Sequence, residues 1–152
     1  STCFVDSDYA GDLVSRRSRT GVLIYCNMAP IVSYSKKQGS IEGSPLGSEF
    51  SAMKTGVELV EGLRYKLRMM GCPIEGPTYV KAENMSVIHN CSNPASTLKK
   101  KSVSIAYHYA RERCAQGVCS VTYVNTLQNL ADMFTKSQPG EVRRRLVQSV
   151  LY

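Results

Sequence analysis

The stretch Cys3-Phe4-Val5-Asp6-Ser7 predicts a short β-strand that carries an acidic residue near the beginning of the chain. Side chains alternate between the two faces of a strand, so Phe4 and Asp6 point to one face while Val5 points to the other. Asp6 closes the apolar run, and Asp8 shares its face at the wet end of the strand. The sequence therefore places a carboxylate at the end of a buried strand.

Three more acidic residues lie where predicted elements begin or end. Glu49 falls in the first turns of the longest helical pattern, Glu83 closes a second short strand, and Asp132 sits early in a late helix. Like charges repel and raise one another's pKa, so a fold that gathers four carboxylates usually does so to hold hard divalent cations. Each of these acids taken alone is more often a solvated surface carboxylate. Together they predict a metal-dependent phosphoryl-transfer enzyme.

The other elements follow from periodicity and from turn and cap residues. Strands are predicted at 20–26 and 31–35 around an Asn-Pro turn, a long helix from the Ser44-Pro45 cap to Gly71, and a strand at 78–82. Helices are predicted at 84–91 and about 103–114, a fifth strand at 118–124, a helix at 127–136 capped by Thr126, and a basic terminal helix after Pro139-Gly140. This order predicts an α/β fold. Its five-stranded mixed sheet has a three-strand antiparallel meander followed by parallel strands, with helices on both faces.

Length and composition are those of one globular domain over residues 1–152. We expect the domain to be a segment of a longer polypeptide, because it begins at Ser1 without a methionine. No apolar stretch is long enough to cross a bilayer, so no membrane partner is expected. The six cysteines include no Cys-x-x-Cys pair, which favours reduced thiols in an intracellular protein over a zinc site or a disulfide framework.

The formal net charge of +7 and the pI of about 9.2 favour a polyanionic partner. The alternative interpretation of the charge is a solvated basic surface. Phosphate contacts position a nucleic acid without reading its sequence, and polar groups can contact the 2′-hydroxyls of an A-like minor groove. The candidate nucleic-acid contacts are Arg16, Arg17, Lys36, Lys37, Gln38, Asn84, Lys99, Lys100 and Lys101.

Five short blocks carry a resemblance to a known family. They are Phe4-Val5-Asp6-Ser7-Asp8-Tyr9-Ala10-Gly11-Asp12, Arg16-Arg17-Ser18-Arg19-Thr20-Gly21, Ser35-Lys36-Lys37-Gln38, Tyr107-His108-Tyr109-Ala110-Arg111-Glu112 and Leu130-Ala131-Asp132-Met133-Phe134-Thr135-Lys136. In this order and spacing, over residues 3–138, they resemble the ribonuclease H domain of copia-type LTR retrotransposon Pol polyproteins.

The resemblance implies a ribonuclease H-like fold with the first strand at the centre of the sheet. It implies an endoribonuclease that hydrolyses the RNA strand of RNA–DNA hybrids during reverse transcription, with an adjacent reverse transcriptase domain as partner. Its catalytic, metal-binding acids map onto Asp6, Glu49, Glu83 and Asp132. These would hold two Mg²⁺ ions, with Mn²⁺ as a substitute. The location implied is intracellular, in a cytoplasmic virus-like particle or the nucleus.

Three departures from the family's pattern support an alternative. Glu83-Asn84 stands where the family has Asp-Asn, and the run Leu46-Gly47-Ser48-Glu49-Phe50 has lost the first of two family glutamates. A family His and Asp are absent from Lys100-Lys101-Ser102-Val103-Ser104. A catalytic group displaced by about 1 Å can cost on the order of a hundredfold in rate. The alternative is a weakened or inactive ribonuclease H-like module that binds nucleic acid or the reverse transcriptase domain. A related nuclease or integrase of the same fold is a third, disfavoured candidate.

Overall fold

The fold is built on a mixed sheet of five strands. A computed structural model describes residues 1–98 and 101–151. Its strands are β1 (Thr2–Asp8), β2 (Arg19–Cys26), β3 (Ala29–Lys37), β4 (Thr78–Ala82) and β5 (Cys119–Tyr123), in the order β3-β2-β1-β4-β5. The pairs β1–β2 and β2–β3 are antiparallel, and β1–β4 and β4–β5 are parallel. The predicted meander, the parallel pairs and the central position of the first strand are confirmed.

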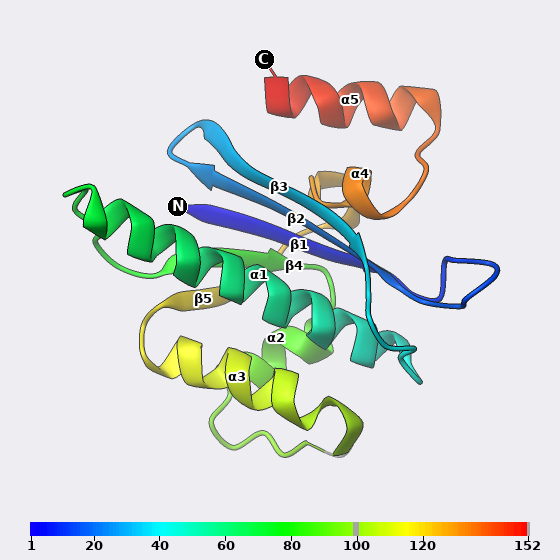
Figure 1. Cartoon of the computed structure of the whole chain (residues 1–152), viewed down its shortest axis with the longest axis horizontal. Coiled ribbons are helices and arrows are strands. Elements are labelled where there is room, and N and C mark those ends of the chain that lie inside the picture. The colour runs from blue at the N-terminus through cyan, green and yellow to red at the C-terminus, as the bar shows by residue number, and fades with distance from the viewer. Residues whose placement is uncertain (99–100, 152) are drawn as a thin grey trace.

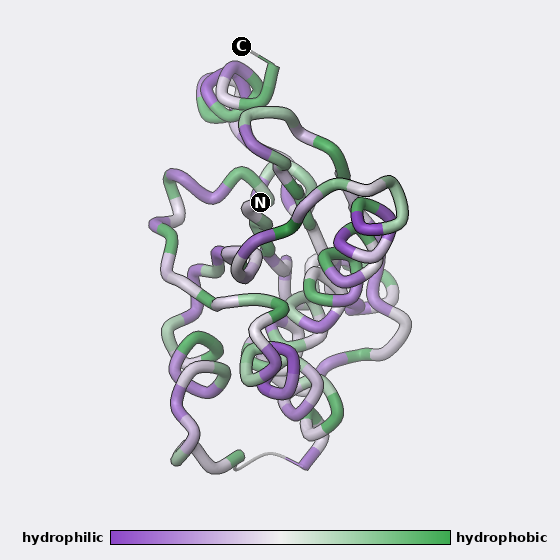
Figure 2. Tube along the Cα trace, turned by 90° about the vertical axis from the view of Figure 1, so that its left-hand side faces the viewer, coloured by the Kyte–Doolittle hydropathy of each residue, from purple (hydrophilic) through white to green (hydrophobic). Residues whose placement is uncertain are grey.

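Helices cover both faces of this sheet (Figure 1). The helices α1 (Pro45–Met69), α2 (Met85–Ser92) and α3 (Ser104–Ala115) lie on one side. On the other side lie the short α4 (Asp132–Thr135) and the terminal α5 (Gly140–Leu151), drawn in orange and red. Two 3-10 turns, η1 (Lys101–Val103) and η2 (Thr126–Gln128), complete the described elements. Hydrophobic and hydrophilic residues both occur along the helices (Figure 2), and α1 buries one set of residues that includes Phe50, Met53, Val57 and Val60.

The alternation of side chains along β1 separates the core from the acidic site. Cys3 and Val5 are buried in the core beneath α1, next to Gly56, where an added Cβ would lie 2.6 Å from the Val5 side chain. On the opposite face, the Phe4 ring packs edge-on against Tyr25. Asp6 follows on that second face, which α4 covers. The predicted division of the two faces is therefore observed.

Both predicted ends of α1 are confirmed. The Ser44 side chain accepts a hydrogen bond from the Gly47 amide at 3.2 Å, and Pro45 takes the first helical position. The helix ends at Met69, and Gly71 follows with φ +74°, a backbone conformation that glycine adopts without steric cost. None of the helices in the described part of the chain combines the length and apolar character that a bilayer crossing requires.

The predicted continuous helix over 127–136 is wrong. Asn125, not Thr126, caps the 3-10 turn η2 by accepting from the Leu127 amide at 2.9 Å. The chain then leaves the helical conformation at Asn129 (φ −77°, ψ 101°), whose side chain accepts from the Ala131 amide at 3.2 Å. Asparagine competes with helical hydrogen bonds in this way, so α4 restarts only at Asp132.

Candidate active site

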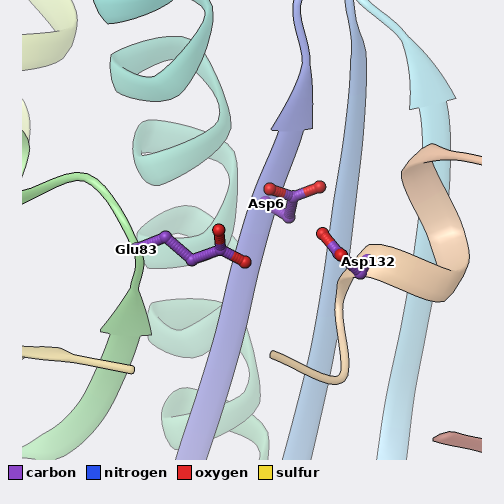
Figure 3. Close-up of side chains that lie close together, drawn as sticks. All are labelled: Asp6, Glu83 and Asp132. Carbon is purple, nitrogen blue, oxygen red and sulfur yellow. The ribbon is translucent and has the colours of Figure 1, made fainter. Parts of the chain in front are cut away.

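Three of the four predicted acids converge at one edge of the sheet. Asp6 lies on the central strand β1, Glu83 follows the parallel neighbour β4, and Asp132 begins α4 (Figure 3). One carboxylate oxygen from each lies within 4.8 Å of the other two. The parallel neighbours β1 and β4 have their carboxyl ends on the same side of the sheet, which brings Asp6 and Glu83 together. Asp132, at the start of α4, lies on the other side of Asp6 from Glu83 (Figure 3).

Glu49, the fourth predicted ligand, lies beside this group but does not belong to it. Hydroxyl oxygens of Ser48 and Ser7 are 3.0 Å apart, which fastens the first turns of α1 against the end of β1. Burial raises the pKa of Glu49 to about 8, and the negative charges of Asp6 and Glu83 add to the rise. The Glu49 carboxyl is therefore within electrostatic reach of the three acids, without being at ligand distance from them.

Lys136 partly balances the concentrated negative charge. Its Nζ lies 3.2 Å from Asp132 Oδ1 and 3.6 Å from Asp6 Oδ2. Burial raises the pKa of Asp132 to about 6, with a further contribution from the charge of Asp6 that Lys136 partly offsets. Burial lowers the pKa of Lys136, but the two carboxylates outweigh this effect and raise it. The lysine therefore stays charged where a cation is electrostatically favoured.

Two residues outside the predicted set bring α4 against Asp6. The Thr135 hydroxyl donates a hydrogen bond to Asp6 Oδ2. Gly21 pairs with Asp6 across β1 and β2, and an added Cβ there would lie 2.7 Å from the Ala131 carbonyl oxygen and from the Thr135 side chain. A bare glycine backbone is thus what lets α4 approach the sheet closely enough to place Asp132.

Glu83 is held by two side chains from the segment between β5 and α4. Thr126 Oγ1 donates to Glu83 Oε2 at 2.8 Å, and Asn129 Nδ2 lies 2.9 Å from Glu83 Oε1. Asn129 is fully buried and its Nδ2 also donates to the Val5 carbonyl oxygen at 3.2 Å. This pair, which we call the Glu83 clamp (Thr126 and Asn129), holds both carboxylate oxygens of Glu83.

Sequence reasoning missed Lys136, Thr135, Gly21 and the Glu83 clamp as parts of the site. Lys136 follows Asp132 by four residues, a spacing that puts two side chains on the same face of a helix. That spacing was a usable signal. The roles of Asn129 and Gly21 depend on contacts with β1 and α4, for which the local sequence gives no pattern.

The basic candidates divide into two groups. Arg17 and Lys37 line a polar hollow of about 550 Å³ that also includes Arg19, Thr135 and Lys136, so this hollow adjoins the acidic group. The Lys37 ammonium pairs with Asp12, and this contact, with hydrogen bonds from Ser15, lowers the pKa of Asp12. Arg16, Lys36 and Lys101 are exposed outside this lining. The predicted contacts Lys99 and Lys100 lie outside the described residues.

Two of the predicted polar contacts have structural roles instead. Gln38 is buried, and its Nε2 donates to Thr20 Oγ1 and to the Ser48 carbonyl oxygen, each at 3.0 Å. Its side chain joins β2 to the start of α1, so its amide nitrogen is engaged within the protein. Asn84 caps α2 by accepting from the amides of Ser86 and Val87. The oxygen of Asn84 is thereby engaged within the protein.

The chemistry of the acidic group fits a divalent cation. Asp6, Glu83 and Asp132 offer carboxylate oxygens, which are the ligands that Mg²⁺ and Mn²⁺ prefer. Asp6 and Asp132 are buried, so their charges are poorly screened by water. Burial and, after it, repulsion from Asp6 raise the pKa of Asp132 and of the adjacent Glu49, and a bound cation would relieve that repulsion.

Comparison with known proteins places the chain among retrotransposon sequences. No protein-family model matches it. It is 30% identical over 137 residues to the retrovirus-related Pol polyprotein from transposon TNT 1-94 of Nicotiana tabacum, covering 90% of this chain and 10% of that protein. The Pol polyproteins from transposons RE1 and RE2 of Arabidopsis thaliana are 28% and 27% identical over 133 residues, which are 88% of this chain and 9% of each of those proteins. The chain thus spans about a tenth of the length of these curated relatives.

Solved structures that resemble it include ribonuclease H domains. The N-terminal RNase H domain of Rv2228c from Mycobacterium tuberculosis superposes with a TM-score of 0.67 at 13% identity, covering 97% of this chain and 96% of that one. LC11-RNase H1 in complex with an RNA/DNA hybrid gives a TM-score of 0.68 at 13% identity, covering 88% and 92%. The chain is therefore homologous to one segment of the Pol polyproteins of copia-type retrotransposons, and its fold is the ribonuclease H fold.

Proposed function

We propose that this chain is a divalent-metal-dependent endoribonuclease that hydrolyses the RNA strand of RNA–DNA hybrids during retrotransposon reverse transcription. The observation that carries the proposal is the convergence of Asp6, Glu83 and Asp132 within 4.8 Å at the edge of the sheet. The Pol polyprotein relatives support the setting, and one structural neighbour was solved with an RNA/DNA hybrid. In that setting we place the domain beside a reverse transcriptase domain, in a cytoplasmic virus-like particle or the nucleus.

Different residues of the chain would bind the metal, orient its ligands and position the phosphate backbone. Asp6, Glu83 and Asp132 would hold the metal, two Mg²⁺ ions or Mn²⁺ in their place, with Glu49 beside them. Bound divalent ions supply an activated water and stabilise the leaving oxygen in phosphodiester hydrolysis. The Glu83 clamp keeps that carboxylate aimed at the group, and Thr135 does the same for Asp6. Arg17, Arg19 and Lys37 in the adjoining hollow would position the phosphate backbone.

The test is cleavage of a labelled RNA–DNA hybrid in Mg²⁺ and in Mn²⁺. Asp6→Asn keeps the shape of the side chain and removes its charge, and we expect it to reduce cleavage by at least a hundredfold, about 3 kcal/mol in the barrier. Glu58→Gln is the matched control, because Glu58 pairs with Lys54 on the outer side of α1. Unchanged cleavage by Asp6→Asn would rule this mechanism out.

A second candidate is a weakened module that binds nucleic acid or the polymerase without efficient cleavage. The observation that favours it is Lys136, whose ammonium group lies between Asp6 and Asp132 where a metal would bind. Glu83→Asp discriminates the two functions. A large rise in cleavage means that the natural site is impaired. Equal or lower cleavage, when the wild-type chain itself cleaves the hybrid, means that Glu83 and its clamp form a working site, and absence of cleavage in both proteins supports the second candidate.

A further inference from the structure

A pair of cysteine thiols lies in contact where α3 runs into β5. Cys114 is in the last turn of α3 and Cys119 opens β5, and their Sγ atoms are 3.6 Å apart. The tight connection enforces this contact. The Gly117 amide donates to the Cys114 carbonyl at 3.0 Å, and Gly117 takes φ +70°, which returns the chain at once to the sheet.

The two sulfurs line a cavity that reaches the surface. The cavity has a volume of about 380 Å³, and its wall also contains Cys91 and Arg111. Exposed residues such as Pro94 and Gly117 form part of the same lining, so the cavity opens towards solvent. Cys119 is 2% exposed, while Cys114 is only partly buried. Cys114 is therefore the thiol that an entering reagent meets first.

The hydrogen bond between the thiols makes them unequal. Either thiol can donate in this contact, and the contact lowers the pKa of Cys114 and, together with burial, raises the pKa of Cys119. Burial raises the pKa of the third thiol, Cys91, to about 12. The thiolate is the reactive form of cysteine, so reactivity concentrates on Cys114.

Metal binding is a poorer use of these three thiols. In the part of the chain that the structure describes, the acids Asp6, Glu83 and Asp132 are the one group of three or more potential ligands whose atoms lie within 4.8 Å of one another. The sulfurs of Cys91, Cys114 and Cys119 do not meet that distance as a set. Two sulfurs in contact, with the third farther off, favour chemistry between two thiols.

We propose that Cys114 and Cys119 form a reversible dithiol–disulfide pair that hydroperoxides oxidise. The Cys114 thiolate attacks the peroxide oxygen and takes one oxygen atom to become a sulfenic acid, while the other oxygen leaves as hydroxide or alcohol. The Cys119 sulfur then attacks the Cys114 sulfur, the S–O bond breaks, and water leaves as the disulfide forms. With hydrogen peroxide, two thiols and one peroxide give one disulfide and two waters, and a thiol reductant reverses the change.

The disulfide would fasten the last turn of α3 to a strand at the edge of the sheet. Among the described strands β5 pairs with β4 alone, and it packs against α2 and α3. Closing the short loop between residues 114 and 119 restricts the unfolded chain, so we expect the oxidised protein to melt at a higher temperature. This inference does not depend on the proposed nuclease activity.

The experiment treats the folded full chain with hydrogen peroxide and determines the intact mass. The remaining thiols are then blocked, and a peptide map is made without reduction. We expect the intact mass to fall by about 2 Da, which corresponds to two hydrogen atoms. The peptide map should contain a cross-linked peptide with Cys114 and Cys119. The melting temperature should rise, and dithiothreitol should reverse that rise. Alkylation of Cys114 should fall at least tenfold after peroxide. Because the peptide map uses the wild-type chain, the test does not depend on whether a variant folds.

Variants sharpen the assignment. Cys114→Ser and Cys119→Ser should each abolish the mass loss, whereas Cys91→Ser, which removes the third thiol of the cavity, should retain it. A cross-link that instead joins Cys26 or Cys72, or a Cys114 that stays fully alkylatable after peroxide, overturns the proposal. Persistence of the mass loss in Cys119→Ser would overturn it as well.

Discussion

At the scale of single residues, the site is defined by charge that the fold has forced together. Asp6 and Asp132 are buried within 4.8 Å of Glu83, and one lysine offsets part of their charge. Burial raises the pKa values of Glu49 and Asp132, and the negative charge of Asp6 adds to both shifts. The metal-free protein therefore carries an electrostatic cost that has a measurable pH dependence.

Glu49→Gln should stabilise the metal-free protein at high pH. The pKa of Glu49 is raised from 4.5 to about 8, so the folded state binds the proton more tightly than the unfolded state does. The stability that protonated Glu49 contributes is consequently lost as pH rises from about 4.5 to 8. The glutamine variant has no carboxyl group to ionise, so its free energy of unfolding does not fall for this reason. We expect an advantage on the order of 1–2 kcal/mol at pH 9 that vanishes near pH 5, measured by urea denaturation in chelator. An advantage independent of pH would contradict this assignment.

Thr126→Val should loosen Glu83 without unfolding the protein. Thr126 is exposed, so its loss should change the free energy of unfolding by less than about 0.5 kcal/mol. Its hydroxyl donates to Glu83 at 2.8 Å, and losing a hydrogen bond to a charged group should reduce cleavage and Mn²⁺ affinity roughly tenfold. Thr126→Ser keeps the hydroxyl and is the matched control. Equal metal affinity in the valine and serine variants would remove Thr126 from the site.

At the scale of elements, the site depends on how closely helices approach the sheet. Two glycines make the contacts short. Gly21 on β2 admits α4, and Gly56 on α1 admits Val5 of β1. Glycine within a helix costs about 1 kcal/mol relative to alanine. At Gly56 this cost is offset by the close packing of α1 on the central strand.

Gly56→Ala and Gly62→Ala should have opposite effects although both lie in α1. A Cβ at Gly56 would lie 2.6 Å from the Val5 side chain, whereas one at Gly62 would meet nothing within 4 Å. We expect Gly56→Ala to lower the free energy of unfolding by about 1–3 kcal/mol through overpacking. Gly62→Ala should raise it by about 0.5–1 kcal/mol through helix propensity. Urea titrations measure the free energy of unfolding of both variants. A Gly56→Ala protein more stable than the wild type would disprove the close contact.

At the scale of the whole molecule, a basic protein concentrates its buried acids at one edge of the sheet. The chain has a formal net charge of +7, while its buried carboxylates Asp6 and Asp132 belong to the same group. The acidic group therefore adjoins a hollow whose lining holds four basic residues, Arg17, Arg19, Lys37 and Lys136, against the two acids Asp8 and Asp12.

Mn²⁺ should stabilise the fold, because it binds the assembled acids of the native state. A ligand at a hundred times its dissociation constant adds about 2.7 kcal/mol to the free energy of unfolding. We expect this gain at pH 8 and its loss below about pH 6, since the pKa of Asp132 is about 6 and metal binding needs the ionised carboxylate. Thermal melts with Mn²⁺ or chelator measure it. Mn²⁺ should no longer stabilise the Asp132→Asn protein, whereas it should stabilise Glu58→Gln as much as the wild type. If Mn²⁺ stabilised both variants equally, the ion would bind at a site other than the three acids.

Hybrid binding should weaken steeply with salt. Each phosphate contact releases counterions, so Arg17→Gln should reduce the slope of log affinity against log salt by about 1. Arg68→Gln is the control, because Arg68 is exposed in the last turn of α1, outside the lining of the hollow beside the acids. Fluorescence anisotropy with a labelled hybrid and a metal chelator gives the slopes. Equal slopes for both variants would show that the hollow does not hold the backbone.

The local pattern predicted most of the elements and failed where a side chain overrode it. Strand alternation, the Ser44-Pro45 start of α1 and its end before Gly71 all depend on neighbours a few residues apart, and each is observed. The predicted helix over 127–136 is split because the buried Asn129 side chain bonds to β1 and to Glu83. Gln38 was predicted to contact nucleic acid but is buried between β2 and α1, since residue type alone does not set burial.

The sequence by itself determined the mixed sheet and placed Asp6, Glu83 and Asp132 at the ends of its elements, because periodicity and caps act over a few residues. Only the tertiary structure decided that these three meet while Glu49 stays beside them, and that Lys136, Thr135 and the Glu83 clamp surround them. Those contacts join residues far apart in the chain, such as Asn129 and Val5. Their distances follow from how closely α4 and α1 pack on β1 and β2, which depends on the whole core rather than on any local run of residues.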